Sequence, residues 1–336
     1  IDHRIWRAAH ELCVEGQAWA EQAAPFDRLP ARAKAVVRPP VWKLSRCSAG
    51  MAVRFRSDAT SLDVRWRLGG DRLALPHMPA TGVSGLDLYV QELGRLRWLA
   101  TGFPFGQKNE LKIVSGLDGT MREFVLYLPL YNSIEELEIG VAPGFQLSPW
   151  PREDAPRPIV FYGTSITQGA CASRPGACHV AILGRRLDRP VINLGFSGNG
   201  TLDLDFAPLL AEIDAAVYVL DCLPNMHAAL VRARLAPFVR ALRAKRPTTP
   251  ILIVEDRRYA DAYLRSDRRR RSESSWRACR ESFETLRADG VRGLHYVRGA
   301  ALLGEDSEDT VDGSHPSDLG FQRMAEVFAD ALYEVL

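Results

Sequence analysis

The segment IVFYGTSITQG, residues 159–169, decides how the second half of the chain folds. Its first four residues form an unbroken apolar run, which is typical of a strand buried on both faces of a parallel sheet. Gly163 and Gly169 stand where the backbone must turn tightly toward a helix. Ser165 therefore follows the carboxyl end of a buried strand, where the loops of such a sheet present side chains to a ligand.

Three more apolar runs of strand length follow, and stretches with helical patterning lie between them. The runs are residues 191–194, 216–220 and 251–254, and the helical stretches are residues 179–187, 229–245, 274–288 and 318–336. Strands that alternate with helices predict an α/β domain with a parallel sheet, whose ligands bind beyond the carboxyl ends of the strands. The residues that follow each apolar run are therefore candidates for chemistry.

The first half of the chain has a different pattern, in which short strand-like segments are separated by turn residues. Residues 62–68 alternate between apolar and polar side chains, as expected for an antiparallel strand with one buried face. The other expected strands are residues 41–44, 51–56, 86–90, 97–100, 123–128 and 137–141. This pattern predicts a β-sandwich. Because residues 149–158 are rich in proline and charge, we expect a sandwich domain over residues 1–155 and an α/β domain over residues 156–336.

Length and composition agree with two globular domains and exclude several classes of protein. At about 150 residues per domain, 336 residues suggest two domains. The 43 Lys and Arg against 41 Asp and Glu leave a net charge of +2, which argues against a nucleic-acid binder that works by bulk charge. No apolar run approaches the roughly 18 to 20 residues needed to cross a bilayer. We therefore expect neither nucleic acid nor a membrane as partner, and the oligomeric state stays open.

The cysteines and the first residues bear on the compartment. Six cysteines without a C-x-x-C pair favour free thiols, and a Cys171–Cys178 disulfide is the alternative in an oxidising compartment. Residues 1–4 lack the basic and then apolar pattern of a secretory signal, so a cytoplasmic location is expected. The chain begins without Met, which leaves a removed leader as the alternative.

A serine, a histidine and a carboxylate are available for nucleophilic catalysis. Ser165 taken alone would more often cap the following helix than act as a nucleophile. Asp312 and His315 stand three residues apart near the C-terminus, and taken alone they would more often be an Asp-Gly turn and a surface histidine. A histidine activates a serine when an acceptor holds its ring in the right tautomer, and a carboxylate three residues away is one way to do that.

Two loops after apolar runs could supply hydrogen-bond donors. The backbone amide of Gly198 and the side-chain amide of Asn225 are suitable donors for the oxyanion that develops during acyl transfer. Each loop by itself is an ordinary glycine or asparagine turn.

Taken in order, these segments resemble the SGNH hydrolases, also called GDSL esterases and lipases. The resemblance matches the family's Ser, Gly, Asn and His to Ser165, Gly198, Asn225 and His315, and it makes Asp312 the third member of the triad. The residue before the serine is Thr164 in place of the usual aspartate of Gly-Asp-Ser, which points to a subfamily.

A motif in the first half supports this resemblance. Residues 85–89, Gly-Leu-Asp-Leu-Tyr, look like the Gly-x-Asp-Leu-Tyr motif of a β-sandwich domain that precedes the hydrolase domain in one group of SGNH proteins. Residues 28–30, 41–45 and 77–82 look similar to that group as well. The resemblance implies a flavodoxin-like hydrolase domain after a jelly-roll-like antiparallel β-sandwich.

Other polar residues near the expected site are candidates for substrate binding. These are Thr164, His227, Arg257, Arg258 and His77, and Glu255 and Asp256 could equally contact a polar substrate. Residues 268–271, four consecutive arginines, are expected in a solvated, mobile loop. The acidic residues 305–309 lack the spacing of a calcium loop, so no metal is expected. No Gly-Lys dipeptide and no Gly-x-Gly-x-x-Gly motif occurs, and no cofactor is implied.

The resemblance implies a serine esterase that works through an acyl-enzyme intermediate, with Ser165, Gly198 and Asn225 as oxyanion donors. The expected substrate is a small acyl ester, with acetyl as the expected acyl group, of a carbohydrate or metabolite. Two alternatives stay open. One is an acyltransferase that uses the same triad, and the other is a carbohydrate-binding protein whose hydrolase domain is only a scaffold.

Overall fold

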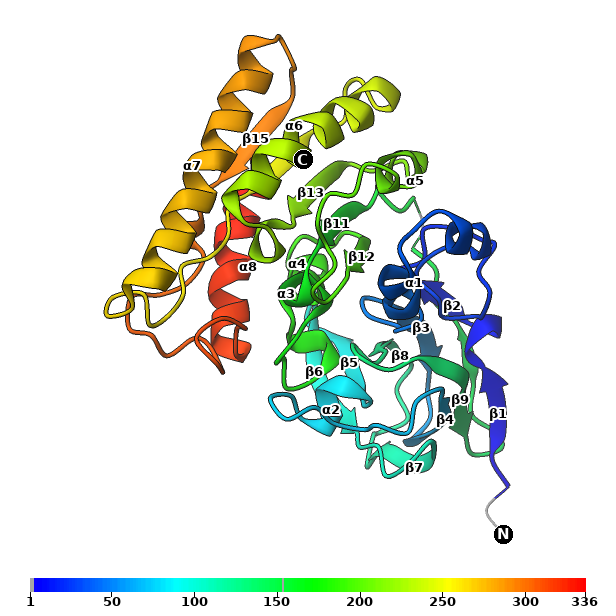
Figure 1. The fold of residues 1–336 in the computed structure, drawn as a ribbon. Coiled ribbons are helices and arrows are strands. Elements are labelled where there is room, and N and C mark those ends of the chain that lie inside the picture. The colour runs from blue at the N-terminus through cyan, green and yellow to red at the C-terminus, as the bar shows by residue number, and fades with distance from the viewer. Residues whose placement is uncertain (1–2, 153) are drawn as a thin grey trace. The chain divides into compact units, whose positions relative to one another are not determined.

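The computed structural model describes residues 3–152 and 154–336, so Glu153 of the expected connection and the first two residues lie outside it (Figure 1). The chain divides into two compact units. The first contains Ile1–Pro30, Ser45–Ala155 and Ser173–Gly176, and the second contains Ala31–Leu44, Pro156–Ala172 and Ala177–Leu336. A single division at residue 155 therefore misses two segments, each of which belongs to the other unit.

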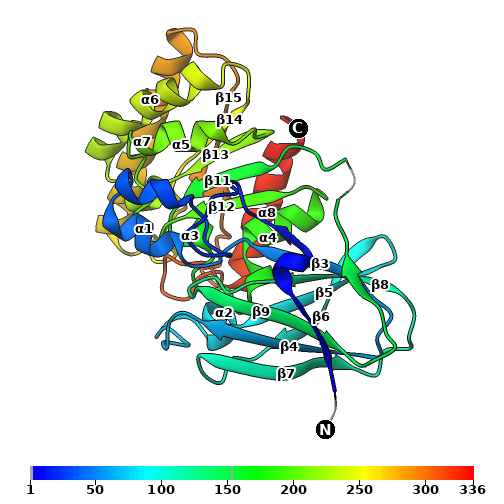
Figure 2. The same cartoon turned by 90° about the vertical axis from the view of Figure 1, so that its right-hand side faces the viewer.

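The first unit is built from two antiparallel sheets (Figure 2). One sheet has the order β1-β9-β4-β7, and the other has the order β10-β3-β8-β5-β6, with β2 beside β3. The strands are β1 (Ile5–Ala8), β2 (Cys13–Glu15), β3 (Ala52–Ser57), β4 (Ser61–Leu68), β5 (Leu86–Glu92), β6 (Arg95–Gly102), β7 (Lys108–Ser115), β8 (Arg122–Tyr127), β9 (Ile134–Val141) and β10 (Leu147–Pro149). A short helix, α2 (Ala80–Val83), precedes β5.

Alternating side chains build the core of this unit. In β4 every second residue is buried, as the alternation of residues 62–68 predicts. Trp66 on β4 and Ile139 on β9 belong to the same apolar cluster as Phe55 on β3 and Leu88 on β5, so residues of both sheets share one core. The predicted β-sandwich is confirmed.

The second unit contains a parallel sheet with the order β12-β11-β13-β14-β15. Numbered within the unit, this order is 2-1-3-4-5, the flavodoxin-like arrangement that the sequence leads us to expect. The strands are β11 (Ile159–Gly163), β12 (Val191–Gly195), β13 (Val217–Asp221), β14 (Ile251–Val254) and β15 (Leu294–Val297).

Helices cover both faces of this sheet, with α4 and α8 on one face and α5, α6 and α7 on the other (Figure 2). On β11 the ring of Phe161 lies edge-on to Phe328 of α8, while Tyr162 stacks on Phe206 of α5 and Phe238 of α6. Apolar layers on both faces explain why β11 is apolar throughout. The helices are α1 (Pro39–Ser45), α3 (Ser165–Gln168), α4 (His179–Arg186), α5 (Phe206–Glu212), α6 (Ala228–Lys245), α7 (Ser266–Ala288) and α8 (Asp318–Tyr333).

Two sequence-based expectations are wrong. The predicted strand at residues 41–44 lies in α1, which begins with Pro39 and Pro40, and proline is well tolerated in the first turn of a helix. The run 268–271 lies in α7 and not in a loop. The buried face of α7 is formed largely by small residues such as Ser272, Ser275 and Ala278, so its apolar periodicity is weak.

No helix within the described residues is long and apolar enough to cross a membrane.

Candidate functional site

The ends of three neighbouring strands bring the candidate residues of the second unit to one edge of the sheet. In the register of the sheet, Gly163 at the end of β11 pairs with Gly195 of β12 on one side and with Asp221 of β13 on the other. Ser165, Gly198 and Asn225 follow these three strand ends within a few residues. Parallel strands therefore gather segments that are far apart in the sequence.

Ser165 is the first residue of α3, and Thr164 caps this helix. The Thr164 side chain accepts a hydrogen bond from the Ile166 amide at 3.3 Å, and Thr164 is fully buried. The structure thus corrects one expectation, because Thr164 is the buried helix cap in place of a substrate contact, and Ser165 lies within the helix. The Ser165 hydroxyl is hydrogen-bonded to His315 Nε2 at 2.9 Å.

Asp312 and His315 form a compact turn before α8. Asp312 Oδ2 lies 2.7 Å from His315 Nδ1, and Asp312 Oδ1 accepts hydrogen bonds from the amides of Ser314 and His315 at 2.9 and 2.8 Å. Partial burial raises the pKa of Asp312, but the hydrogen bonds from the His315 amide and ring outweigh it, so the pKa lies below its usual value. An ionised Asp312 favours a proton on Nδ1, which leaves Nε2 to accept the proton of Ser165.

Arg257 lies behind this turn and is 2% exposed. Its Nε donates to the Ser314 carbonyl oxygen at 3.0 Å, and its Nη2 donates to the Ser314 hydroxyl. Its Nη1 is paired with the buried carboxylate of Asp256. The expected substrate contacts of Arg257 and Asp256 are therefore corrected, because both side chains are buried and paired with each other, and Arg257 holds the turn.

The loops that follow β12 and β13 contain Gly198 and Asn225, the two expected donors outside Ser165. With the Asn225 carboxamide oriented so that Oδ1 accepts from the amides of Asn199 and Gly200 at 3.0 and 3.2 Å, Nδ2 is the donor of this side chain on the other side of the carboxamide. Gly198 has a φ of +69°, in the left-handed region that glycine adopts readily. A Cβ at Gly200 would lie 1.9 Å from the Gly163 carbonyl oxygen, so the loop packs directly against the strand that leads to Ser165.

A buried polar network beneath the site was missed by the sequence reasoning. The Thr167 hydroxyl donates to Asp221 Oδ2 at 2.8 Å, and the Thr167 carbonyl accepts from Asn193 Nδ2 at 2.8 Å. Asn193 Oδ1 in turn accepts from the Gly195 amide at 2.9 Å. Burial raises the pKa of Asp221 to about 7. These residues join α3 to both neighbouring strands, and their polar character at strand ends is the only signal in the sequence.

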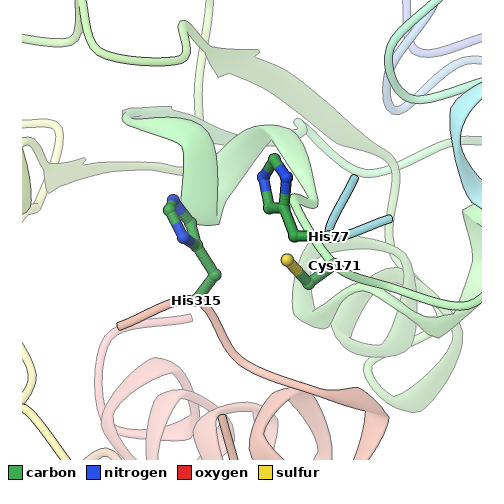
Figure 3. A group of neighbouring side chains, drawn as sticks. All are labelled: His77, Cys171 and His315. Atoms are coloured by element: carbon green, nitrogen blue, oxygen red, sulfur yellow. The ribbon is translucent and has the colours of Figure 1, made fainter. Parts of the chain in front are cut away.

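Cys171 lies beside His315 in the second unit (Figure 3). Its Sγ is within 4.8 Å of a ring nitrogen of His315. Burial, with the charge of Asp312 in addition, raises the pKa of the thiol to about 12. A raised pKa favours the neutral form of the Cys171 thiol. Cys171 and Cys178 are both free thiols.

The remaining predicted substrate contacts lie in different surroundings. His227 is exposed and caps α6, with Nδ1 accepting from the Leu230 amide at 3.3 Å. Arg258 is exposed, and its guanidinium lies 5.8 Å from the ring centroid of Trp276. His77 is exposed in the first unit, and its contact with substrate stays a prediction.

Two groups of acidic residues have structural partners. Glu255 is buried and accepts hydrogen bonds from Arg280 Nη1 at 2.6 Å and from the Tyr296 hydroxyl at 2.6 Å, which corrects its expected contact with substrate. Within the acidic stretch 305–309, Asp306 and Asp309 both pair with Arg323, at 2.7 and 2.9 Å. Arg323 therefore joins the two ends of this acidic stretch to α8.

Comparisons with known proteins place this fold and site in a family. Residues 156–333 match the model of the GDSL-like lipase/acylhydrolase family, and residues 5–147 match that of the GxDLY domain, the N-terminus of SGNH hydrolase-type esterases. The chain belongs to the GDSL-like lipase/acylhydrolase family and is an ester hydrolase of the SGNH type, which confirms the resemblance noted in the sequence. A search of curated proteins finds no match.

Solved structures extend the likeness over the whole chain. A protein from Bacteroides ovatus described as a GDSL-like lipase is 34% identical, with a TM-score of 0.95 over 99% of this chain and 98% of that one. A salicylyl-acyltransferase from a tetracycline biosynthetic pathway is 21% identical, with a TM-score of 0.77 over 98% and 97%. A family two carbohydrate esterase from Clostridium thermocellum, solved with cellohexaose, is 17% identical, with a TM-score of 0.59 over 85% and 92%. The last two likenesses concern the fold.

Proposed function

We propose that this protein is a serine esterase that removes a small acyl group, acetyl in the first instance, from a carbohydrate or metabolite ester. The observation that carries the proposal is the hydrogen-bonded chain from Ser165 through His315 to Asp312, with distances of 2.9 and 2.7 Å. A serine nucleophile, a base and an acceptor that orients the base are the groups that acyl transfer requires.

In the first half of the reaction, His315 Nε2 takes the proton of the Ser165 hydroxyl as its oxygen attacks the ester carbonyl. Asp312 stabilises the imidazolium that results, because its carboxylate faces Nδ1. Hydrogen bonds from the Ser165 and Gly198 amides and from Asn225 Nδ2 stabilise the negative charge of the tetrahedral intermediate. His315 then gives its proton to the departing alcohol, which leaves an acyl-enzyme on Ser165.

In the second half, a water molecule takes the place of the alcohol. His315 accepts a proton from this water, the resulting hydroxide attacks the acyl carbon, and the same donors stabilise the second tetrahedral intermediate. Collapse of this intermediate breaks the bond to Ser165 Oγ, which recovers its proton from His315. The acid product leaves, and the free enzyme is restored.

The substrate class rests on exposed polar side chains of the second unit and on the named relatives. Arg258 and His227 present exposed polar side chains after strands of the sheet that carries the triad, where hydroxyl groups of a sugar or metabolite would find partners. Fold-level likeness to a carbohydrate esterase agrees with such an alcohol.

The test is a panel of p-nitrophenyl esters and acetylated sugars, assayed with the wild type and Ser165→Ala. We expect acetate esters to be hydrolysed faster than octanoate esters. We also expect loss of at least about a thousandfold in kcat for Ser165→Ala and labelling of Ser165 by a fluorophosphonate probe. A preference for octanoate would contradict the small acyl group, and full activity of Ser165→Ala would contradict the mechanism. A wild type that binds sugars but neither turns over an ester nor reacts with the probe would favour the carbohydrate-binding scaffold.

A second candidate function is acyl transfer to an alcohol other than water. The observation that favours it is the likeness, over nearly the whole chain, to a protein named as a salicylyl-acyltransferase. Hydrolysis of an acetate ester in the presence of added alcohols separates the two, because a transferase forms the new ester at the expense of acetate release.

A further inference from the structure

One arginine of the segment 31–44 contacts the loop that carries the proposed oxyanion donors. Arg38 Nη1 donates to Asn199 Oδ1 at 2.7 Å, and Nη2 donates to the Asn199 carbonyl oxygen at 2.9 Å. Nη2 also donates to Thr201 Oγ1 at 3.2 Å, and Nε donates to Asp203 Oδ2 at 2.9 Å. A single planar guanidinium therefore fixes three residues of one loop, which is a use to which arginine is well suited.

Contacts from outside this loop add to its own hydrogen bonds, in which the Asn199 and Gly200 amides donate to the Phe196 carbonyl oxygen at 2.8 and 3.0 Å. Besides Arg38, Arg234 Nη1 donates to the Thr201 carbonyl oxygen at 2.9 Å. Gly198 and Gly200 give it little conformational rigidity of its own. Leu202 has a φ of +52°, a conformation that is costly for a bulky residue and persists only where the surroundings impose it. Without contacts to fix residues 199–203, we expect the loop to sample other backbone conformations.

The contacts of Arg38 lead to the proposed donor through one residue. Arg38 holds the side chain and the carbonyl of Asn199, while the amides of Asn199 and Gly200 bind Oδ1 of Asn225. The orientation of the Asn225 carboxamide, and hence the position of Nδ2, follows from the position of these two amides. Electrostatic stabilisation of an oxyanion depends on donors that are in place before the reaction.

We propose that Arg38 is a positioning residue for the oxyanion hole and acts through Asn199 on Asn225. This inference rests on the proposed function, because it takes Asn225 as a donor to the oxyanion. It means that a residue among the first 155 supports the oxyanion hole, although the sequence shows no candidate for the triad there. Arg38 stands 161 residues before Asn199, so no local pattern connects them.

The chain provides a matched control in the same segment. Arg32 lies in the same segment of the second unit, and its guanidinium pairs with Glu212 of α5 at 2.6 Å. Asp203 also forms an ion pair with Arg234 at 2.5 Å, and we expect this pair to persist in an Arg38→Ala variant. Both features favour a variant that still folds.

The experiment compares Arg38→Ala, Arg38→Lys and Arg32→Ala with the wild type in p-nitrophenyl acetate hydrolysis. We expect kcat of Arg38→Ala to fall roughly tenfold to a hundredfold with KM changed less than about twofold, because only the transition state uses the donors. Arg38→Lys should recover part of the loss, and guanidinium ions at millimolar concentration should recover part of it in Arg38→Ala. Arg32→Ala should retain the wild-type kcat.

A double-mutant cycle tests the route of the effect. In an Asn225→Ala background, Arg38→Ala should lower kcat by less than about twofold, because the donor it positions is already absent. Equal effects of Arg38→Ala in both backgrounds, or equal losses in Arg38→Ala and Arg32→Ala, would overturn the proposal.

Hydrogen exchange gives a readout that does not depend on turnover. The amides of Asn199 and Gly200 should exchange faster in Arg38→Ala than in the wild type or Arg32→Ala, and unchanged exchange would overturn the inference by itself. Absence of esterase activity in the wild type, with the exchange difference present, would instead contradict the proposed function.

Discussion

The buried guanidinium of Arg257 donates hydrogen bonds to both the carbonyl oxygen and the hydroxyl of Ser314, the residue directly before His315. Arg257 follows β14, and it is held in turn by the buried carboxylate of Asp256. The position of the proposed general base thus depends on a buried ion pair on a different segment of the chain.

Replacement of Arg257 should lower both stability and activity. In Arg257→Met the carboxylate of Asp256 stays buried without its partner, and breaking such a pair costs about 3–5 kcal/mol in the free energy of unfolding. Loss of the contacts to Ser314 should lower kcat as well. Urea unfolding and ester hydrolysis measure the two effects.

The double variant Asp256→Asn/Arg257→Met separates the effect on stability from the effect on activity. It removes the unpaired charge, so we expect it to regain much of the stability while kcat stays low. A kcat that recovers together with the stability would show that Arg257 contributes only to folding.

Alanine at two glycines of one loop should have unequal effects. At Gly200 a Cβ would meet the Gly163 carbonyl oxygen at 1.9 Å, so the backbone must move and we expect a loss of about 2–3 kcal/mol together with most of the activity. At Gly198 the space around a Cβ is open, and only the φ of +69° opposes alanine, at about 1 kcal/mol. Thermal unfolding and kcat of the two variants test this order, and a more damaging change at Gly198 would contradict it.

The Gly-x-Asp-Leu-Tyr motif should contribute to stability through its aspartate. Asp87 is fully buried and accepts hydrogen bonds from Arg174 Nη1 at 2.7 Å and from the Gly176 amide at 2.8 Å, so it holds the segment 173–176 in the first unit. We expect Asp87→Asn to cost about 2–3 kcal/mol in unfolding free energy, because Arg174 loses a buried partner. The matched control is Asp118→Asn, which breaks an exposed pair with Arg122 and should have little effect. Similar losses in both variants would argue against a specific role of the motif.

His179 should make the stability sensitive to acid. It is fully buried among aromatic rings, stacked on Phe321 and Phe328, and burial lowers its pKa from 6.5 to about 3. Between these values the unfolded chain binds a proton at His179 that the folded protein does not, so stability falls as the pH falls through this range.

The difference in unfolding free energy between the wild type and His179→Phe isolates this effect, since other titrating groups are common to both. We expect the wild type to lose about 1.4 kcal/mol per pH unit relative to the variant between about pH 6 and pH 3.5. A difference that does not vary with pH would show that His179 titrates normally. Urea unfolding at a series of pH values provides the measurement.

Local sequence patterns predicted most of the fold. They failed in segments where the buried residues are small or polar, or where prolines begin a helix. The run 159–162 was recognisable because a strand covered on both faces must be apolar throughout. The helix α7 was placed too short, since residues 266–273 at its start bury only Ser272 and are otherwise mostly charged. The helix α1 was taken for a strand, although the Pro39–Pro40 pair is compatible with the first turn of a helix.

The sequence by itself determined the alternation of strands and helices and the candidate residues at the strand ends. Both follow from short-range regularities, namely the period of apolar residues and the spacing of a motif. Only the tertiary structure decided which polar residues are buried as supports of the site and which stay exposed. Arg38 and Arg257 meet their partners across 161 and 57 residues, and Thr164 and Glu255 are withdrawn into the interior by packing. Such pairings arise because a buried charge or hydroxyl must find a partner wherever the fold provides one, and this is set by the packed chain and not by its local order.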